Sequence, residues 1–154
     1  MPMKHKAVIE KIKRQLREEI KEISKDAATA AYEIAITAEA YAVSDTPRDT
    51  GALINGYYVN VEENPDGAHA TVGNTERYAY WVHEMPGTLK GQPREHFGKT
   101  NNLSDFGPKQ VISFGGGTGN GCYWDPDADP KFLERALNDH KAEYMDIAMK
   151  YLKR

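Results

Sequence analysis

MKHKAVIEKIKRQLREEIKEISKDAATAAYEIAITAEAYAV, residues 3–43, contains neither Gly nor Pro and sets the architecture expected of this chain. Its apolar residues recur at steps of three or four, namely Val8, Ile12, Leu16, Ile20, Ile23, Ala27, Ala30, Ile34, Ala38 and Tyr41. That period predicts one amphipathic helix over residues 3–43. Pro47 should end it, because the residue before a proline is pushed out of helical backbone.

A helix of this length is long for the chain. About forty helical residues would span about 60 Å, whereas a compact chain of this size has a radius of gyration of about 15 Å. We therefore expect either a break near Ser24 or a basic end that projects from the body. In the second case Val8, Ile12 and Leu16 would be exposed and would favour assembly with a partner.

The segments after the helix read as a turn and a hairpin. Residues 45–53 predict a turn and a short helical start, with Asp49 and Thr50 as caps and Gly51 allowing close backbone approach. Alternation of side chains over residues 57–63 and 68–73, around the turn signal at 64–67, predicts a β-hairpin over 57–73.

The rest of the chain completes an α+β fold. Residues 78–83 could form a short helix or a strand, and the Gly-rich stretch 86–121 predicts a long loop, with a possible strand at 109–114. Residues 131–153 predict a C-terminal helix that follows a capping turn. We expect one domain in which a long N-terminal helix and a C-terminal helix pack on a small, mainly antiparallel sheet. Residues 78–84 or 109–124 would supply further strands.

Composition narrows the class of protein. The 154 residues carry a net charge of −3, and the single cysteine, Cys122, excludes an internal disulfide framework. No apolar run is long enough to span a membrane, and the charged N-terminus lacks a signal core, so synthesis in a reducing cytoplasm is expected. Charge is uneven: residues 1–25 carry +4, residues 131–154 carry +2 and the middle carries −9. Such a layout can orient docking partners.

Motifs that would carry chemistry are incomplete. The Gly-rich run 114–121 lacks the lysine of a phosphate-binding loop. The alternating carboxylates of 125–129 lack the glycine and glutamate of a calcium loop, so helix capping is the better interpretation. His83, His96 and Cys122 match no metal-ligand spacing. Core packing is the default interpretation for Tyr80 and Trp81. We expect no cofactor, no metal and no catalysis.

Two alternative functions stay open at this level. One is a small metal-dependent hydrolase that uses His83, His96 and the carboxylates of 125–129. The other is a nucleic-acid-binding adaptor that uses the basic helix, although that helix lacks interleaved aromatic residues.

Four segments together resemble the bacteriophage tail-completion family, the minor tail or head–tail joining components of long-tailed phages. They are Pro47-Arg-Asp-Thr-Gly-Ala-Leu53, Val72-Gly73, Tyr78-Ala-Tyr-Trp-Val-His-Glu84 and Lys131-Phe-Leu-Glu-Arg-Ala-Leu137. They follow a long charged helix in the order seen in the family, and only the insertion 86–121 departs from its pattern. The matching residues, read here as structural, are Pro47, Asp49, Thr50, Gly51, Leu53, Tyr78, Tyr80, Val82, His83, Phe132 and Leu133. In this interpretation Asp49, Thr50 and Gly51 cap a corner and Leu53 fills the core.

The resemblance implies a structural virion protein, made in the bacterial cytoplasm and located at the neck. It would complete the tail and join it to the head connector as part of a homo-oligomeric ring, expected to have six subunits. Head connector or adaptor proteins and the tail terminator or tail tube protein would be its partners, with neither membrane nor sequence-specific nucleic acid. Candidate interface residues are Lys11, Lys13, Arg14 and Arg17 on the basic helix and Val111 and Phe114 in the loop.

Overall fold

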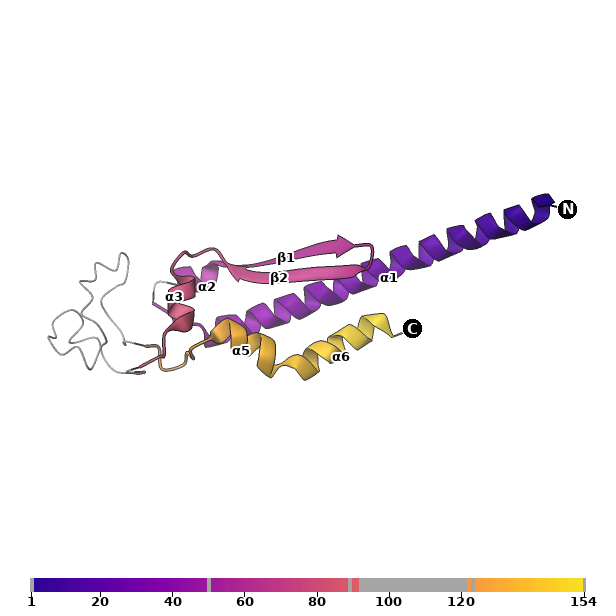
Figure 1. Cartoon of the computed structure of the whole chain (residues 1–154). Helices are drawn as coiled ribbons and strands as arrows, with labels where there is room; N and C mark the ends of the chain where they lie inside the picture. The colour runs from indigo at the N-terminus through magenta and orange to yellow at the C-terminus, as the bar shows by residue number, and fades with distance from the viewer. Residues whose placement is uncertain (1, 50, 89, 92–121, 123, 154) are drawn as a thin grey trace. The chain divides into compact units, whose positions relative to one another are not determined.

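A computed structural model describes residues 2–49, 51–88, 90–91, 122 and 124–153, with the side chains of residues 2–5 excepted. The elements, labelled in Figure 1, are α1 (Pro2–Asp45), α2 (Ala52–Asn55), β1 (Tyr57–Asn64), β2 (Gly67–Asn74), α3 (Ala79–Glu84), α5 (Phe132–Asp139) and α6 (Lys141–Leu152). The fold is α+β, as predicted. The chain forms two compact units, one of residues 1–39, 58–73 and 137–154 and the other of residues 40–57 and 74–136.

Helix α1 is continuous over 44 residues, Pro2–Asp45, so the first of the two alternatives, a break near Ser24, does not occur. The absence of Gly and Pro from residues 3–43 leaves no position at which the helical hydrogen bonds must fail. The second alternative, in which the apolar side chains of the N-terminal end are exposed, holds. Large apolar residues between Val8 and Ile23 are 46–56% exposed, whereas Ala30, Ala35 and Ala38 further along are buried.

In the first unit α1 packs between the hairpin and α6 along its later turns (Figure 1). The Ser24 hydroxyl donates a hydrogen bond to the carbonyl oxygen of Asn64 at the end of β1, at 3.2 Å. Further along α1, Glu33 accepts hydrogen bonds from Lys150, at 3.1 Å, and from the Tyr151 hydroxyl on α6. Alanines on this part of α1 let the neighbouring elements approach closely.

The hairpin confirms the predicted alternation. In β1 the side chains of Tyr57, Val59 and Val61 are partly buried, and the intervening Tyr58 and Asn60 are exposed. Ala68, Ala70 and Val72 of β2 are likewise partly buried. The two strands are antiparallel and form a two-stranded sheet. In the described residues no further strand joins it. Of the two alternatives for residues 78–84, a short helix or a strand, the structure shows the helix, α3, so this segment adds no strand.

The second unit has a small core in which the motif residues Leu53 and Phe132 are 5% and 2% exposed. Trp124 is also buried, and its indole N–H donates to the carbonyl oxygen of Ala128 at 3.0 Å. Thr46, at the end of α1, is 1% exposed. Its hydroxyl donates to the Ala42 carbonyl oxygen at 2.6 Å and lies 2.8 Å from the Tyr57 hydroxyl.

Two helix boundaries differ from the prediction. The predicted helix 131–153 divides into α5 and α6 at His140, after Asn138 and Asp139, because these three residues are poor helix formers. The cap of α2 is Gly51, with φ +86°, rather than Asp49. A glycine suits this position because left-handed backbone is strained for residues that carry a Cβ.

Several predictions fall outside the described residues: the role of Thr50, the interface residues Val111 and Phe114, the position of His96, the strand at 109–114 and most of the loop 86–121. Among the described residues, Lys90 and Trp124 form an isolated parallel β-bridge. The described helices include none that is long and apolar enough to cross a membrane.

Candidate functional site

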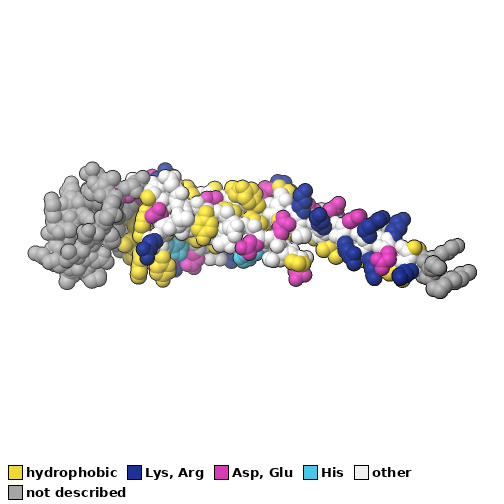
Figure 2. All heavy atoms as spheres, turned by 90° about the horizontal axis from the view of Figure 1, so that it is seen from above, with side chains coloured by type: hydrophobic (Ala, Val, Ile, Leu, Met, Phe, Trp, Pro, Cys, Tyr) yellow, Lys and Arg dark blue, Asp and Glu magenta, His cyan; other side chains and the backbone are white. Residues whose placement is uncertain are grey.

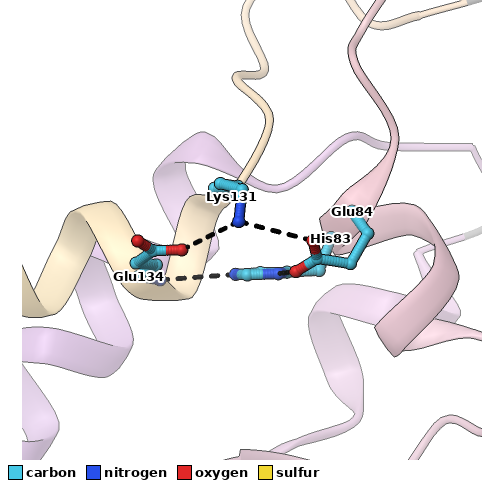
Figure 3. Close-up of polar contacts among 4 residues, drawn as sticks. All are labelled: His83, Glu84, Lys131 and Glu134. Atoms are coloured by element: carbon cyan, nitrogen blue, oxygen red, sulfur yellow. Dashed lines mark hydrogen bonds and ion pairs between the residues drawn. The ribbon is translucent and has the colours of Figure 1, made fainter.

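A polar cluster joins α3 to the start of α5 in the second unit, and Figure 3 shows its four residues, His83, Glu84, Lys131 and Glu134. The Lys131 ammonium lies 3.3 Å from Glu84 and 3.1 Å from Glu134. The backbone N–H of Lys131 also donates to the His83 carbonyl oxygen, at 2.9 Å. Lys131 holds this place with φ 55°, a left-handed conformation that a lysine rarely adopts.

Both ring nitrogens of His83 are engaged. Nε2 accepts the backbone N–H of Glu134 at 3.4 Å, and Nδ1 lies 2.8 Å from Glu84 Oε1. Because Nε2 is the acceptor, Nδ1 carries the proton and donates to Glu84. The ring also stands edge-to-face on Phe132, with centroids 4.9 Å apart. His83, the described histidine of the hydrolase hypothesis, is therefore occupied in joining two helices.

Two of the carboxylates of 125–129, those of Asp125 and Asp129, bind backbone groups and cations. Asp129 pairs with Arg135 at 2.7 Å and with Lys90 at 3.0 Å, while Asp125 accepts the backbone N–H of Arg48 at 3.0 Å and that of Asp127 at 3.0 Å. Among the residues that the structure describes, no group of three or more His, Cys, Asp or Glu could hold a metal ion.

These contacts shift the pKa values of the groups in the second unit. Hydrogen bonds from His83 and Lys131 lower the pKa of Glu84, and hydrogen bonds from Arg135 and Lys90 lower that of Asp129. Glu134 and Glu84 raise the pKa of Lys131. Burial raises the pKa of Tyr78, and the charges of Glu76 and Asp49 add to the shift. The pairs are solvent-exposed, so each contributes little stability by itself.

An aromatic surface lies on α3. Tyr80 and Trp81 are 66% and 68% exposed and contact each other edge-to-face, with ring centroids 5.5 Å apart. Core packing, expected for both, is therefore wrong. The six-residue helix uses Val82 and His83 for partly buried contacts and leaves its other side to solvent. Tyr78 and Met85 add exposed apolar surface.

A basic surface follows the N-terminal half of α1. Figure 2 shows Lys and Arg side chains gathered there among acidic ones. The interface candidates Lys11, Arg14 and Arg17 have no ion pair with another described residue, and Lys13 lies 3.6 Å from Glu10. The exposed apolar stripe runs along the same turns of the helix.

The site residues predicted from the sequence thus lie in several parts of the fold and do not form one site. The structure brings His83 together with Phe132, both motif residues. Leu53 lies in the core, Pro47, Gly51, Val82 and Leu133 are partly buried, and Asp49 is exposed. Sequence analysis missed Lys131 and Glu134 as a linked pair. Their i,i+3 spacing was visible, but the approach of Glu84 depends on tertiary structure.

The described residues form a helical frame with a small hairpin, and their apolar and basic surfaces are exposed, as in proteins that associate with others. The family model described as "Bacteriophage HK97-gp10, putative tail-component" matches residues 6–83, just over half of the chain. The chain belongs to this family of phage tail components, which indicates a structural component of the virion. The match ends before α5, so residues 131–137 lie beyond it. Neither the curated proteins nor the solved structures with which the chain was compared include a match.

Proposed function

We propose that the chain acts at the neck end of the phage tail, where it completes the tail and joins it to the head connector as a subunit of a closed ring. The observation that carries this proposal is the exposed apolar stripe on α1 in a member of a tail-component family. Large apolar side chains along four turns of a helix are rarely left to solvent in a protein that works alone.

Ring closure follows from contacts between different surfaces of identical subunits. The chain offers surfaces of opposite charge for such contacts. Lys11, Arg14 and Arg17 are cations on α1, and the hairpin end carries Glu62, Glu63 and Asp66, all exposed. Pairing of such surfaces fixes orientation and speeds encounter more than it adds affinity. Six copies are the expected number, with connector or adaptor proteins on one side and the tail terminator or tube protein on the other.

The test is complementation of a phage that lacks this gene with the triple variant Lys11→Glu, Lys13→Glu, Arg14→Glu. Filled heads and separate tails are expected to accumulate, because the reversed charge repels the acidic surface it should meet. Lys141→Glu, an exposed lysine on α6, is the matched control and should assemble normally. Wild-type yields of infectious particles from the triple variant would show that the basic residues of α1 are not needed to join head and tail.

Position is tested separately, by gold labelling of a tagged chain on purified tails. Label at the head-proximal end is expected. Label along the tube or at the distal tip would overturn the neck assignment, although the chain would remain a tail component. Native mass spectrometry of the purified chain would then report the number of copies in the ring.

A further inference from the structure

The exposed stripe on α1 is flanked by charges of opposite sign on its two sides. At about 100° per residue, Ile9, Ile12, Leu16, Ile20 and Ile23 lie within a narrow sector of the helix surface. Lys6, Lys13 and Arg17 lie on one side of that sector, and Glu19, Glu22 and Asp26 lie on the other. The stripe therefore has a basic edge and an acidic edge.

The stripe continues an interface that the chain already uses. Ile9 and Ile20, Ile12 and Ile23, and Leu16 and Ala27 are each eleven residues apart, and the next members of the series include Ile34 and Ala38. The later positions are covered in the first unit, where Ala38 is fully buried and Ile34 partly buried. Before Ser24, where the hairpin ends, the same face is open. An eleven-residue repeat keeps such a face nearly straight along the helix.

We infer that the open part of α1, residues 8–23, packs in parallel against the same segment of a second copy of this chain. In a parallel arrangement the basic edge of one helix faces the acidic edge of the next, so opposite charges meet on both sides of the apolar seam. In an antiparallel arrangement each edge would face its own kind, which places Lys13 and Arg17 beside the same residues of the other copy. The charges therefore select the parallel form.

Helix pairs of this kind approach to about 8–10 Å between axes, which removes a central row of side chains from water. Ile9, Leu16 and Ile23 form that row, at 46–52% exposure in the single chain. The back of the helix, with Lys11, Arg14, Glu18 and Lys21, takes no part in this contact and stays available for the charged surface of another subunit. This contact goes beyond the proposed function, because it joins two copies through the same surface, in addition to the contacts between different surfaces that would close a ring.

The test uses disulfide trapping in the full-length chain, with the native Cys122 replaced by Ser. Residues in the central row of a parallel pair lie opposite their own counterparts, within the Cα distance of about 4.4–6.8 Å that a disulfide needs. Ile9→Cys and Leu16→Cys are each expected to give a covalent dimer as the main species under mild oxidation. Arg14→Cys, on the back of the helix, is the matched control and should remain monomeric on a denaturing gel.

Each other outcome overturns the inference in a recognisable way. Dimer from Leu16→Cys without dimer from Ile9→Cys, together with cross-linking of Ile9→Cys to Ile23→Cys, would show antiparallel pairing. Cross-linking of Ile9→Cys to Met149→Cys would show instead that the stripe docks on the exposed methionines of α6. No excess of dimer over the Arg14→Cys control would show that no second copy covers the stripe.

The charged edges are tested by reversal. Glu19→Lys is expected to slow trapping of Ile9→Cys, and adding Lys13→Glu and Arg17→Glu in the same chain should restore it, because the charges at these facing positions are then exchanged. Glu18→Lys, on the back of the helix, is the matched control and should leave the rate unchanged. Trapping is measured on purified protein, so it can succeed where gold labelling at the neck fails, and the two proposals are separable.

Discussion

The imidazole of His83 stands edge-to-face against the ring of Phe132, at 4.9 Å between centroids, although 49 positions separate them in the chain. The contact joins α3 to α5 inside the second unit. The contact also gives both motif residues a structural role. Phe132 supplies a buried ring, and His83 covers that ring and accepts a hydrogen bond from the backbone N–H of Glu134 in the first turn of α5. The histidine that sequence alone left as a catalytic candidate has a packing role.

Truncation of Phe132 should therefore destabilise the second unit strongly. Phe132→Ala is expected to lower the free energy of unfolding by about 3–5 kcal/mol, because a nearly buried ring is replaced by a cavity. Urea denaturation followed by circular dichroism measures this change. Leu137→Ala, at an exposed position on the same helix, should cost far less, and equal losses would show that Phe132 is not a core residue.

The hydroxyl of Thr46 closes the end of α1. Thr46→Val keeps the shape but removes the hydrogen bond to Ala42 and the contact with Tyr57. The expected loss is about 1–3 kcal/mol in the free energy of unfolding, because buried polar groups lose a partner. Thr46→Ser retains the hydroxyl and should preserve both contacts at the cost of a methyl group. A valine variant more stable than the serine variant would contradict this assignment.

Gly51 is required by backbone geometry rather than by space. Its φ is +86°, and a Cβ added there would meet only Asn55, at an ordinary 3.7 Å. Gly51→Ala should cost about 1–2 kcal/mol, the penalty of left-handed backbone. Gly51→Asn should cost less, because asparagine tolerates that conformation. Thermal unfolding of the two variants compares them, and equal melting temperatures would reject the argument.

The second unit should lose stability in acid. Glu84 and Asp129 have pKa values below their ordinary 4.5 and 3.8, so the folded form binds protons less readily than the unfolded form. Their contribution is complete above those ordinary values and is lost as pH falls through the lowered ones. The melting temperature should therefore fall as the pH is lowered below about 4.5. The double variant Glu84→Gln, Asp129→Asn should show a smaller fall.

The periodic segments could be predicted because the spacing of apolar residues within each segment determines which side chains are buried. The stripe of α1 and the alternation in β1 and β2 follow from residue spacing alone, and both elements form where expected. In the motif of Pro47 to Leu53, Leu53 is buried and Gly51 rather than Asp49 caps α2. The family match over residues 6–83 confirms the resemblance that these segments supported.

Tertiary contacts and short elements were not predictable in the same way. Residues 78–84 are aromatic and apolar, which fits a strand and a buried helix equally well, and the exposure of Tyr80 and Trp81 depends on what packs beside them. The polar cluster of Lys131 requires two helices to approach from distant parts of the chain. Asn138, Asp139 and His140 weaken the helix where α5 and α6 divide, but they do not end a helix as clearly as a proline would.

Because α1 is a continuous helix of 44 residues, the direction in which its N-terminal side chains point depends on the number of residues in between. Removal of one residue before Ala27 would turn everything upstream by about 100° and shorten the helix by about 1.5 Å. The apolar stripe would then point away from the line that the covered part of α1 defines. Removal of eleven residues would leave the direction nearly unchanged, since eleven residues make close to three turns. Whether an insertion or deletion in this segment is tolerated should therefore depend mainly on how far it rotates the apolar stripe about the helix axis, and less on the number of residues added or removed.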